Sequence, residues 1–242
     1  RRRLTGPLGW GVSAAAVAMS LLFLYWAYGT VTTQILRLVF LAFTLVLSFL
    51  LYPARSKRGL MQVAWFDWLL VAASLLVVGY PLWDFEEFIY RAALPTQRDQ
   101  LFGALTILLV LEATRRTTGW ILPVVALGFL GYAWLGAWLP APWTHQGYGL
   151  DRVVGHMYMT LEGIFGVPLD GAATFIILFT IYGAGLEHSE AGEFYVNFSL
   201  AATGGKPTAA GRTVTLASFL LGGPSGAGVA PPVTLGSVAW PL

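Results

Sequence analysis

The amino-acid sequence predicts an all-α membrane protein, with about six transmembrane helices, interfacial amphipathic helices and the start of a re-entrant helical hairpin. Three observations support this fold class. Hydrophobic residues make up 57% of the chain and charged residues only 11%, with a mean hydropathy of +0.69. Soluble domains carry about 25% charged residues. The basic residues stand in short clusters between long apolar runs, and the last apolar region is interrupted by glycine and proline.

Six apolar runs are candidates for membrane-spanning helices. In order, they are Gly11 to Tyr28, Ile35 to Tyr52, Met61 to Trp83, Leu101 to Leu111, Thr117 to Leu139 and Gly163 to Leu186. A helix needs about 20 residues to cross the hydrocarbon core. The fourth run is shorter than this, so it spans only if the flanking residues from Gln97 to Ala113 contribute.

Three charged residues lie inside or beside these runs. Arg37 stands one turn into the second run, from which its long side chain is expected to snorkel outward. Asp67 begins the third run, and we expect it at the interface. Asp170 lies in the sixth run and is a possible intramembrane acid. Such acids are functional candidates because burying them in lipid is costly, although Asp170 is also close enough to the start of the run to be interfacial.

Two further segments have an amphipathic helical rhythm. Leu150 to Glu162, which follows a polar loop, and Ala191 to Ala202 both alternate apolar and polar positions with a helical period. Helices of this kind lie in the membrane interface.

Glu112 precedes Arg115 and Arg116 by three and four residues. This is the spacing of a structural ion pair at a helix end.

The basic clusters predict the orientation of the chain. They comprise Arg1 to Arg3, the group Arg55, Lys57 and Arg58, and the pair Arg115 and Arg116. All fall on one side if the fourth run crosses, and the positive-inside rule makes that side cytoplasmic. The acidic loop from Asp84 to Asp99 then faces outward. We therefore expect a multi-pass protein of the bacterial inner membrane with a cytoplasmic N-terminus.

The Gly/Pro-rich stretch from Gly222 to Pro232 is the most informative segment. It contains four glycines and three prolines, so it disfavours a plain spanning helix. Non-helical backbone survives at membrane depth only where protein buries it or where it lines a cavity, as in discontinuous transporter helices. We expect a re-entrant hairpin over about 208–242. Close packing through small residues is the alternative. Because the sequence begins with Arg1 and ends at Leu242 within this element, we expect it to be part of a longer protein.

Composition and motifs argue against several other classes. The chain has no cysteine, and its net charge of +2 gives no basic face for nucleic acid. Gly223 to Gly226 fits a serine protease pattern, but all three histidines precede it in loops or amphipathic stretches, which leaves no base for the serine. No lysine follows the glycines, as a phosphate-binding loop would require. We therefore predict a protein that is not an enzyme.

Four stretches of the sequence form a recognisable set: Glu112 to Gly119, Glu162 to Leu169, Gly183 to Phe194, and Ser225 to Ala230 running on to Gly236 and Pro241. They resemble the fused membrane subunit of tripartite ATP-independent periplasmic (TRAP) transporters, in the branch that pairs with TAXI-type binding proteins. The resemblance covers roughly Gln100 to Leu242. It implies that residues 1–116 are a small-subunit-like region of about four spans, and that 117–242 begin the large transporting subunit.

The resemblance also implies a site at the hairpin tip. It places a sodium ion at Ser225, Gly226 and Gly228, with Thr234 and Ser237 as weaker lining candidates. The family's usual Ser-Gly-Ser and Ala-Asn are here Ser225-Gly226-Ala227 and Ala230-Pro231, so one hydroxyl and one carboxamide are missing. The coupling ion is therefore Na⁺ or H⁺, and no other cofactor is expected.

The partners implied by the resemblance are a periplasmic TAXI-type substrate-binding protein, the lipid bilayer and a small organic anion, such as a carboxylate. No nucleic-acid partner is expected. The alternative is a non-transporting membrane scaffold or assembly module.

Overall fold

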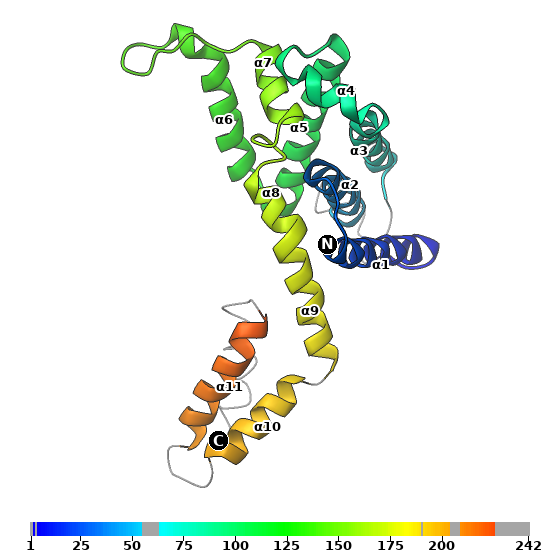
Figure 1. The fold of residues 1–242 in the computed structure, drawn as a ribbon, viewed down its shortest axis with the longest axis vertical. Coiled ribbons are helices and arrows are strands. Elements are labelled where there is room, and N and C mark those ends of the chain that lie inside the picture. The colour runs from blue at the N-terminus through cyan, green and yellow to red at the C-terminus, as the bar shows by residue number, and fades with distance from the viewer. Residues whose placement is uncertain (1, 3, 55–62, 190, 204–208, 226–242) are drawn as a thin grey trace. The chain divides into compact units, whose positions relative to one another are not determined.

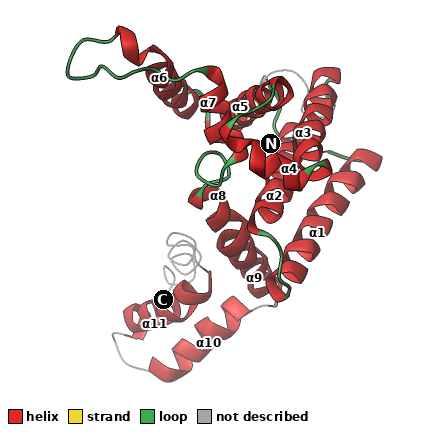
Figure 2. Cartoon of the chain, turned by 45° about the horizontal axis from the view of Figure 1, so that its top comes forward, coloured by secondary structure: helices red, strands yellow, loops and turns green. Residues whose placement is uncertain are grey.

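The computed structural model describes residues 2, 4–54, 63–189, 191–203 and 209–225 (Figure 1). These residues form helices joined by loops and turns, with no strand among them (Figure 2). The chain divides into two compact units, residues 1–173 and 174–242. This division lies well beyond residue 116, where the sequence predicts the end of the small-subunit-like region. That earlier boundary concerns a relationship between subunits and stays a prediction.

The helices of the first unit follow the predicted runs closely. They are α1 (Pro7–Tyr28), α2 (Thr33–Leu51), α3 (Trp65–Trp83), α4 (Phe85–Tyr90), η1 (Arg91–Ala93), α5 (Gln97–Thr118), α6 (Ile121–Leu135), η2 (Gly136–Trp138), α7 (Leu150–Val154), η3 (Gly155–Met159) and α8 (Val167–Gly171). The turn η4 (Ala172–Ile176) follows α8. Five stretches of the described residues are long and apolar enough to cross a membrane: Pro7–Tyr28, Thr33–Leu51, Trp65–Trp83, Ile121–Trp138 and Val167–Gly185. These findings confirm the all-α membrane class.

The fourth predicted run is a longer helix than its apolar residues alone suggest. Helix α5 is 22 residues long, and its start is fixed by a capping box between Thr96 and Asp99. Its end is marked by Gly119, whose φ of 92° is unfavourable for other residue types. Charged residues near both ends keep α5 out of the five candidates, but α5 runs antiparallel to the whole of α3. Tyr80 near the end of α3 contacts Asp99, and Asp67 near its start contacts Arg116.

The core of the first unit lies among α2, α3 and α5. Its fully buried apolar side chains include Leu38 and Phe49 of α2, Val77 of α3 and Leu109 of α5. Within a membrane the hydrophobic effect does not drive helices together, because the lipid tails are themselves apolar. This packing therefore depends on close fit and on polar contacts between helices. Several such contacts are described below.

The segment Leu150 to Glu162 differs from its prediction. It forms the short helix α7 and a π-helical turn, η3, and its apolar side packs against α5. Tyr158 is fully buried and its hydroxyl donates to the Val77 carbonyl at 2.5 Å. Burial raises the pKa of the Tyr158 phenol, which keeps this donor protonated. The close approach depends on Gly103, because a Cβ at that position would lie 2.3 Å from a methyl carbon of Val154. The apolar side of the segment is therefore covered by α5, and its place at the membrane interface stays a prediction.

The second unit contains α9 (Ile177–His188), α10 (Ala191–Thr203) and α11 (Ala209–Ser225). Helix α10 confirms the helix predicted for Ala191 to Ala202, and α10 packs mainly against α11. Helix α11 contains the predicted first arm of the hairpin. Helix α11 continues through Gly222, Gly223 and Pro224 to Ser225, and the rest of the predicted hairpin lies outside the described residues, so the hairpin stays a prediction.

Candidate functional site

The predicted hairpin tip begins where the described residues end. Ser225 is the last residue of α11, so its backbone belongs to the C-terminal end of a helix. Gly226, Gly228, Thr234 and Ser237 lie outside the described residues. The proposed cation site at Ser225, Gly226 and Gly228 therefore stays a prediction. Elsewhere in the described part of the chain, no group of three or more His, Asp or Glu side chains could hold a metal ion.

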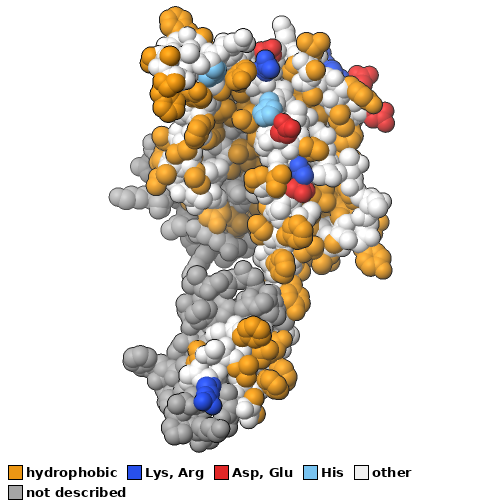
Figure 3. Space-filling model, turned by 60° about the vertical axis from the view of Figure 1, so that its left-hand side comes forward, with side chains coloured by type: hydrophobic (Ala, Val, Ile, Leu, Met, Phe, Trp, Pro, Cys, Tyr) orange, Lys and Arg blue, Asp and Glu red, His pale blue; other side chains and the backbone are white. Residues whose placement is uncertain are grey.

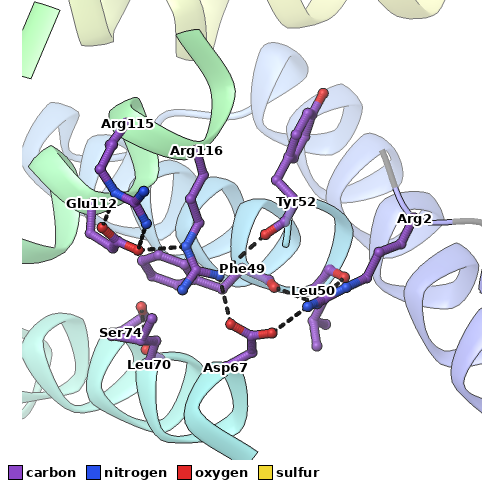
Figure 4. A network of polar contacts seen from close by, with 10 residues as sticks. All are labelled: Arg2, Phe49, Leu50, Tyr52, Asp67, Leu70, Ser74, Glu112, Arg115 and Arg116. Carbon is purple, nitrogen blue, oxygen red and sulfur yellow. Dashed lines mark hydrogen bonds and ion pairs between the residues drawn. The ribbon is translucent and has the colours of Figure 1, made fainter. Parts of the chain in front are cut away.

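A network of buried charges lies at one end of the α3–α5 pair (Figure 4). At its centre Asp67 is 1% exposed and accepts from two arginines. One carboxylate oxygen lies 2.5 Å from Nη2 of Arg2, and the other lies 2.6 Å from Nη1 of Arg116. Arg2 also donates to the carbonyls of Phe49 and Leu50 at the end of α2. The network thus joins the N-terminus to the ends of three helices.

Arg116 connects this carboxylate to a second one. Its Nε donates to Glu112 at 2.7 Å, and its Nη1 donates to the Tyr52 carbonyl at 3.2 Å. The guanidinium lies over the Phe49 ring, 5.1 Å from the ring centroid. Arg115 forms two bonds to Glu112, at 2.7 and 2.8 Å. The structural ion pair predicted for Glu112 with Arg115 and Arg116 is therefore confirmed.

The chemistry of this network is structural. Each carboxylate is bonded to two guanidinium groups, so neither is available as a proton acceptor or as a ligand for a passing ion. A buried charge that loses its partner is strongly unfavourable, which holds the helix ends together. Asp67 is enclosed by protein, and its expected depth at the membrane interface stays a prediction. Arg2, which the sequence marked only as a topological signal, is one of its two arginine partners.

Asp170 lies in a second ion pair, in which only the arginine is buried. Arg37 Nε donates to its carboxylate at 3.0 Å, and another nitrogen of Arg37 donates to the Phe165 carbonyl. The side chain of Arg37 is 9% exposed, whereas that of Asp170 is 35% exposed. The expectation that Arg37 snorkels away from its helix is therefore wrong. The pair compensates both charges and links α2 to α8, which makes Asp170 a tethered acid.

The opposite end of the α3–α5 pair has an acidic cluster around one arginine. Arg91 Nη1 lies 2.9 Å from Asp84 and 3.1 Å from Glu87, and its Nε lies 3.4 Å from Asp99. The bond to Asp84 raises the pKa of Arg91. Asp99 is fully buried and also accepts from the Tyr80 hydroxyl at 2.7 Å. The acidic loop from Asp84 to Asp99 thus contains Arg91, whose positive charge partly neutralises the carboxylates around it.

The sequence singled out Arg37, Asp67 and Asp170 as charged residues in or beside apolar runs, but it did not predict the ion pairs that they form. Arg37 and Asp170 are far apart in the chain, as are Arg2 and Asp67, so no local spacing connects them. One signal was available: an arginine one turn inside an apolar run is costly unless an acid faces it, and Asp170 was one of the two acids placed within the predicted runs.

Comparison with known protein families gives a match over the C-terminal part of the chain. The family model described as "Tripartite ATP-independent periplasmic transporter, DctM component" matches residues 105–242. This range starts inside α5 and includes α6 to α11. No curated protein matches the chain. No solved structure matches it either.

Proposed function

Because the chain belongs to the DctM component family of tripartite ATP-independent periplasmic transporters, we propose that it imports a small organic anion, such as a carboxylate, with a cation gradient. The observation that carries the proposal is the family match itself, which extends over α11 and the glycine-rich sequence that follows it. A membrane component of this family is a secondary transporter, so the energy comes from an ion gradient and no ATP is hydrolysed.

We place the coupling ion at the hairpin tip. A helix that ends in small residues leaves carbonyl oxygens without intrahelical partners, and such carbonyls and hydroxyls are suitable ligands for a small cation. The Ser225 hydroxyl and the backbone around Gly226 and Gly228 would supply them, with Thr234 and Ser237 nearby in sequence. The missing serine at Ala227 and the missing asparagine at Pro231 leave both Na⁺ and H⁺ as candidates.

The partners follow from the same family. We propose that a periplasmic TAXI-type binding protein delivers the substrate and that residues 1–116 act as a fused small subunit. The buried polar contacts between the unmatched region and the matched region support the second part. Those that also cross the boundary at residue 116 join Arg37 to Asp170 and Val77 to Tyr158.

The location proposed for the protein is the inner membrane, with a cytoplasmic N-terminus. Arg2, the start of α3 and the end of α5 meet in one network, as a common side for the basic clusters requires. Cysteines introduced beside Lys57 and Glu87 distinguish the two orientations. An impermeant thiol reagent added to intact cells should label the position beside Glu87 only.

The transport proposal is tested by uptake into proteoliposomes that contain the full-length protein, with its binding protein added outside. Titration of sodium and, separately, of the proton gradient identifies the coupling ion. Ser225→Ala should weaken the apparent affinity for that ion by about 5- to 30-fold, the loss of one neutral ligand worth about 1–2 kcal/mol. Ser20→Ala is the matched control, because Ser20 lies in α1 and bonds only the Ala16 carbonyl of its own helix.

Two results would contradict these proposals in different ways. An unchanged ion dependence in Ser225→Ala would remove that residue from the site and would favour close packing as the role of the glycines. A folded, full-length protein that transports no anion under either gradient would favour the non-transporting scaffold or assembly module.

A further inference from the structure

A cavity of about 650 Å³ lies between α5, α6 and the α7–η3 segment, apart from the hairpin. Its walls are apolar and include Ile107 and Val110 of α5 with Ala126 and Phe129 of α6. Its polar lining residues are Tyr148, Arg152 and His156, which come from the segment after α6. Binding cavities for organic ligands fall in the range of about 300–1,000 Å³, so this one is large enough to hold part of a ligand.

The polar residues gather at one end of the cavity. The backbone N–H of Tyr148 donates to the Ala133 carbonyl at 2.9 Å, and that of His145 donates to the Gly136 carbonyl at 3.0 Å. The loop after α6 therefore folds back onto the C-terminal end of α6. The guanidinium of Arg152 lies 5.2 Å from the centroid of the Tyr148 ring, which fixes it at the same level.

This level corresponds to a membrane interface. Trp134, Trp138 and Trp143 are all more than three-fifths exposed, and they lie at the end of α6 and in the loop that follows. Exposed tryptophans at the end of a spanning helix are typical of the headgroup region. The apolar wall formed by Ala126 to Ala133 extends about 10 Å along α6 from this level, at 1.5 Å per residue. The polar end of the cavity is thus at headgroup depth, and its apolar part is in the hydrocarbon.

The charges at the polar end favour an anion. Among the described residues, no carboxylate oxygen lies within 4.0 Å of the Arg152 guanidinium, although Asp151 precedes it in the chain. Glu162 lies 3.8 Å from Nδ1 of His156, so its charge is directed toward the histidine. Arg152 is left as a cation at headgroup depth, where an arginine binds phosphate through two parallel hydrogen bonds.

We propose that this cavity is a binding site for a membrane glycerophospholipid. One acyl chain lies along the apolar wall between α5 and α6, and the phosphate is bound by Arg152, with His156 beside it. The two-part lining matches both parts of the ligand: the apolar side chains of α5 and α6 suit an acyl chain, and the positive charge of Arg152 suits a phosphate. On the face drawn in Figure 3, hydrophobic side chains predominate and charged side chains gather in small groups.

The test uses the full-length protein in detergent and a phosphatidylglycerol with a photoreactive group in its acyl chain. After irradiation, labelled positions are mapped by mass spectrometry. We expect labels on the lining residues of α5 and α6. Unlabelled phosphatidylglycerol should compete for them, whereas glycerol 3-phosphate, which has no acyl chain, and diacylglycerol, which has no phosphate, should not. Equal competition by diacylglycerol would overturn the role of Arg152.

Two pairs of variants sharpen the result. Arg152→Gln should lower the labelling at least about fivefold, since a hydrogen bond to a charged group is lost. Arg98→Gln, another exposed arginine that lies outside this cavity, should leave it unchanged. Ala126→Phe should narrow the cavity and lower the labelling, and Val125→Phe, on the neighbouring exposed position, should not.

The following outcomes contradict the proposal. Labels spread evenly over all exposed helix faces, with no effect of Arg152→Gln, would mean ordinary solvation by lipid. Absence of any label on the lining residues would mean that another segment of the chain or a protein partner fills the cavity. The Ala126→Phe variant keeps the test decisive if Arg152→Gln fails to fold, because its charges are those of the natural protein.

Discussion

The two ends of the α3–α5 helix pair contain similar residues in different surroundings. At one end, three arginines and two carboxylates form a network in which the side chains of Arg2, Asp67 and Arg116 are at most 2% exposed. At the other end, three carboxylates surround Arg91, and Glu87 is 77% exposed. The excess of positive charge is on the buried side and the excess of negative charge on the open side. The first end is therefore held by buried charges, whereas at the second end only Asp99 is buried and the carboxylates of Asp84 and Glu87 are exposed to water.

The largest effect is expected at Asp67. Asp67→Asn keeps the shape of the side chain and leaves two buried guanidinium groups without their shared carboxylate. We expect a loss of about 3–5 kcal/mol in the free energy of unfolding. The measurement is denaturation of the full-length protein in mixed micelles.

A double-mutant cycle separates the pair from its surroundings. Arg116→Met combined with Asp67→Asn should cost less than the sum of the two single changes, because the double variant leaves only Arg2 without the Asp67 carboxylate, whereas Asp67→Asn alone also leaves Arg116 without it. Simple additivity would mean that the Asp67–Arg116 contact carries no coupling energy, and the contrast between the two ends would then be lost.

An intermediate effect is expected at Asp170. Its carboxylate is partly exposed, so water can replace some of what Arg37 provides. Asp170→Asn should cost about 1.5–3 kcal/mol, as for a hydrogen bond to a charged group. Arg37→Gln introduced together with Asp170→Asn should recover part of the loss. If Asp170→Asn instead abolished transport without changing the denaturation curve, Asp170 would be a functional acid and more than a tether.

The smallest effect is expected at Glu87. Its ion pair with Arg91 is an exposed pair with i,i+4 spacing. Such pairs contribute about 0.3–0.5 kcal/mol, so Glu87→Gln should be close to neutral in the same denaturation assay. A loss of more than 2 kcal/mol would show that this end is as rigidly held as the other.

The sequence predicted the helices better than their contacts. Long apolar runs specify spanning helices almost alone, and the predicted limits of α1, α2 and α10 lie close to those observed. Charged partners were predicted only where local spacing joins them, as for Glu112 with Arg115 and Arg116. Arg2 with Asp67 and Arg37 with Asp170 are pairs across the fold, and a periodic pattern contains no information about them. Helix α11 includes Gly222 and Gly223 despite their weak helical propensity, which the packing of α11 on α10 can offset.

The position of Asp67 in the chain has a consequence for the order of synthesis. Arg2 and Asp67 are both made before Arg116, so the first of the two ion pairs can form as soon as α3 enters the membrane. The second must wait until α5 is complete. Until then Asp67 is compensated by the N-terminus alone, and the arrival of Arg116 completes the closure of one end of the bundle. Arg2 thus neutralises the Asp67 carboxylate during assembly, before Arg116 is in place, and keeps this contact in the folded protein.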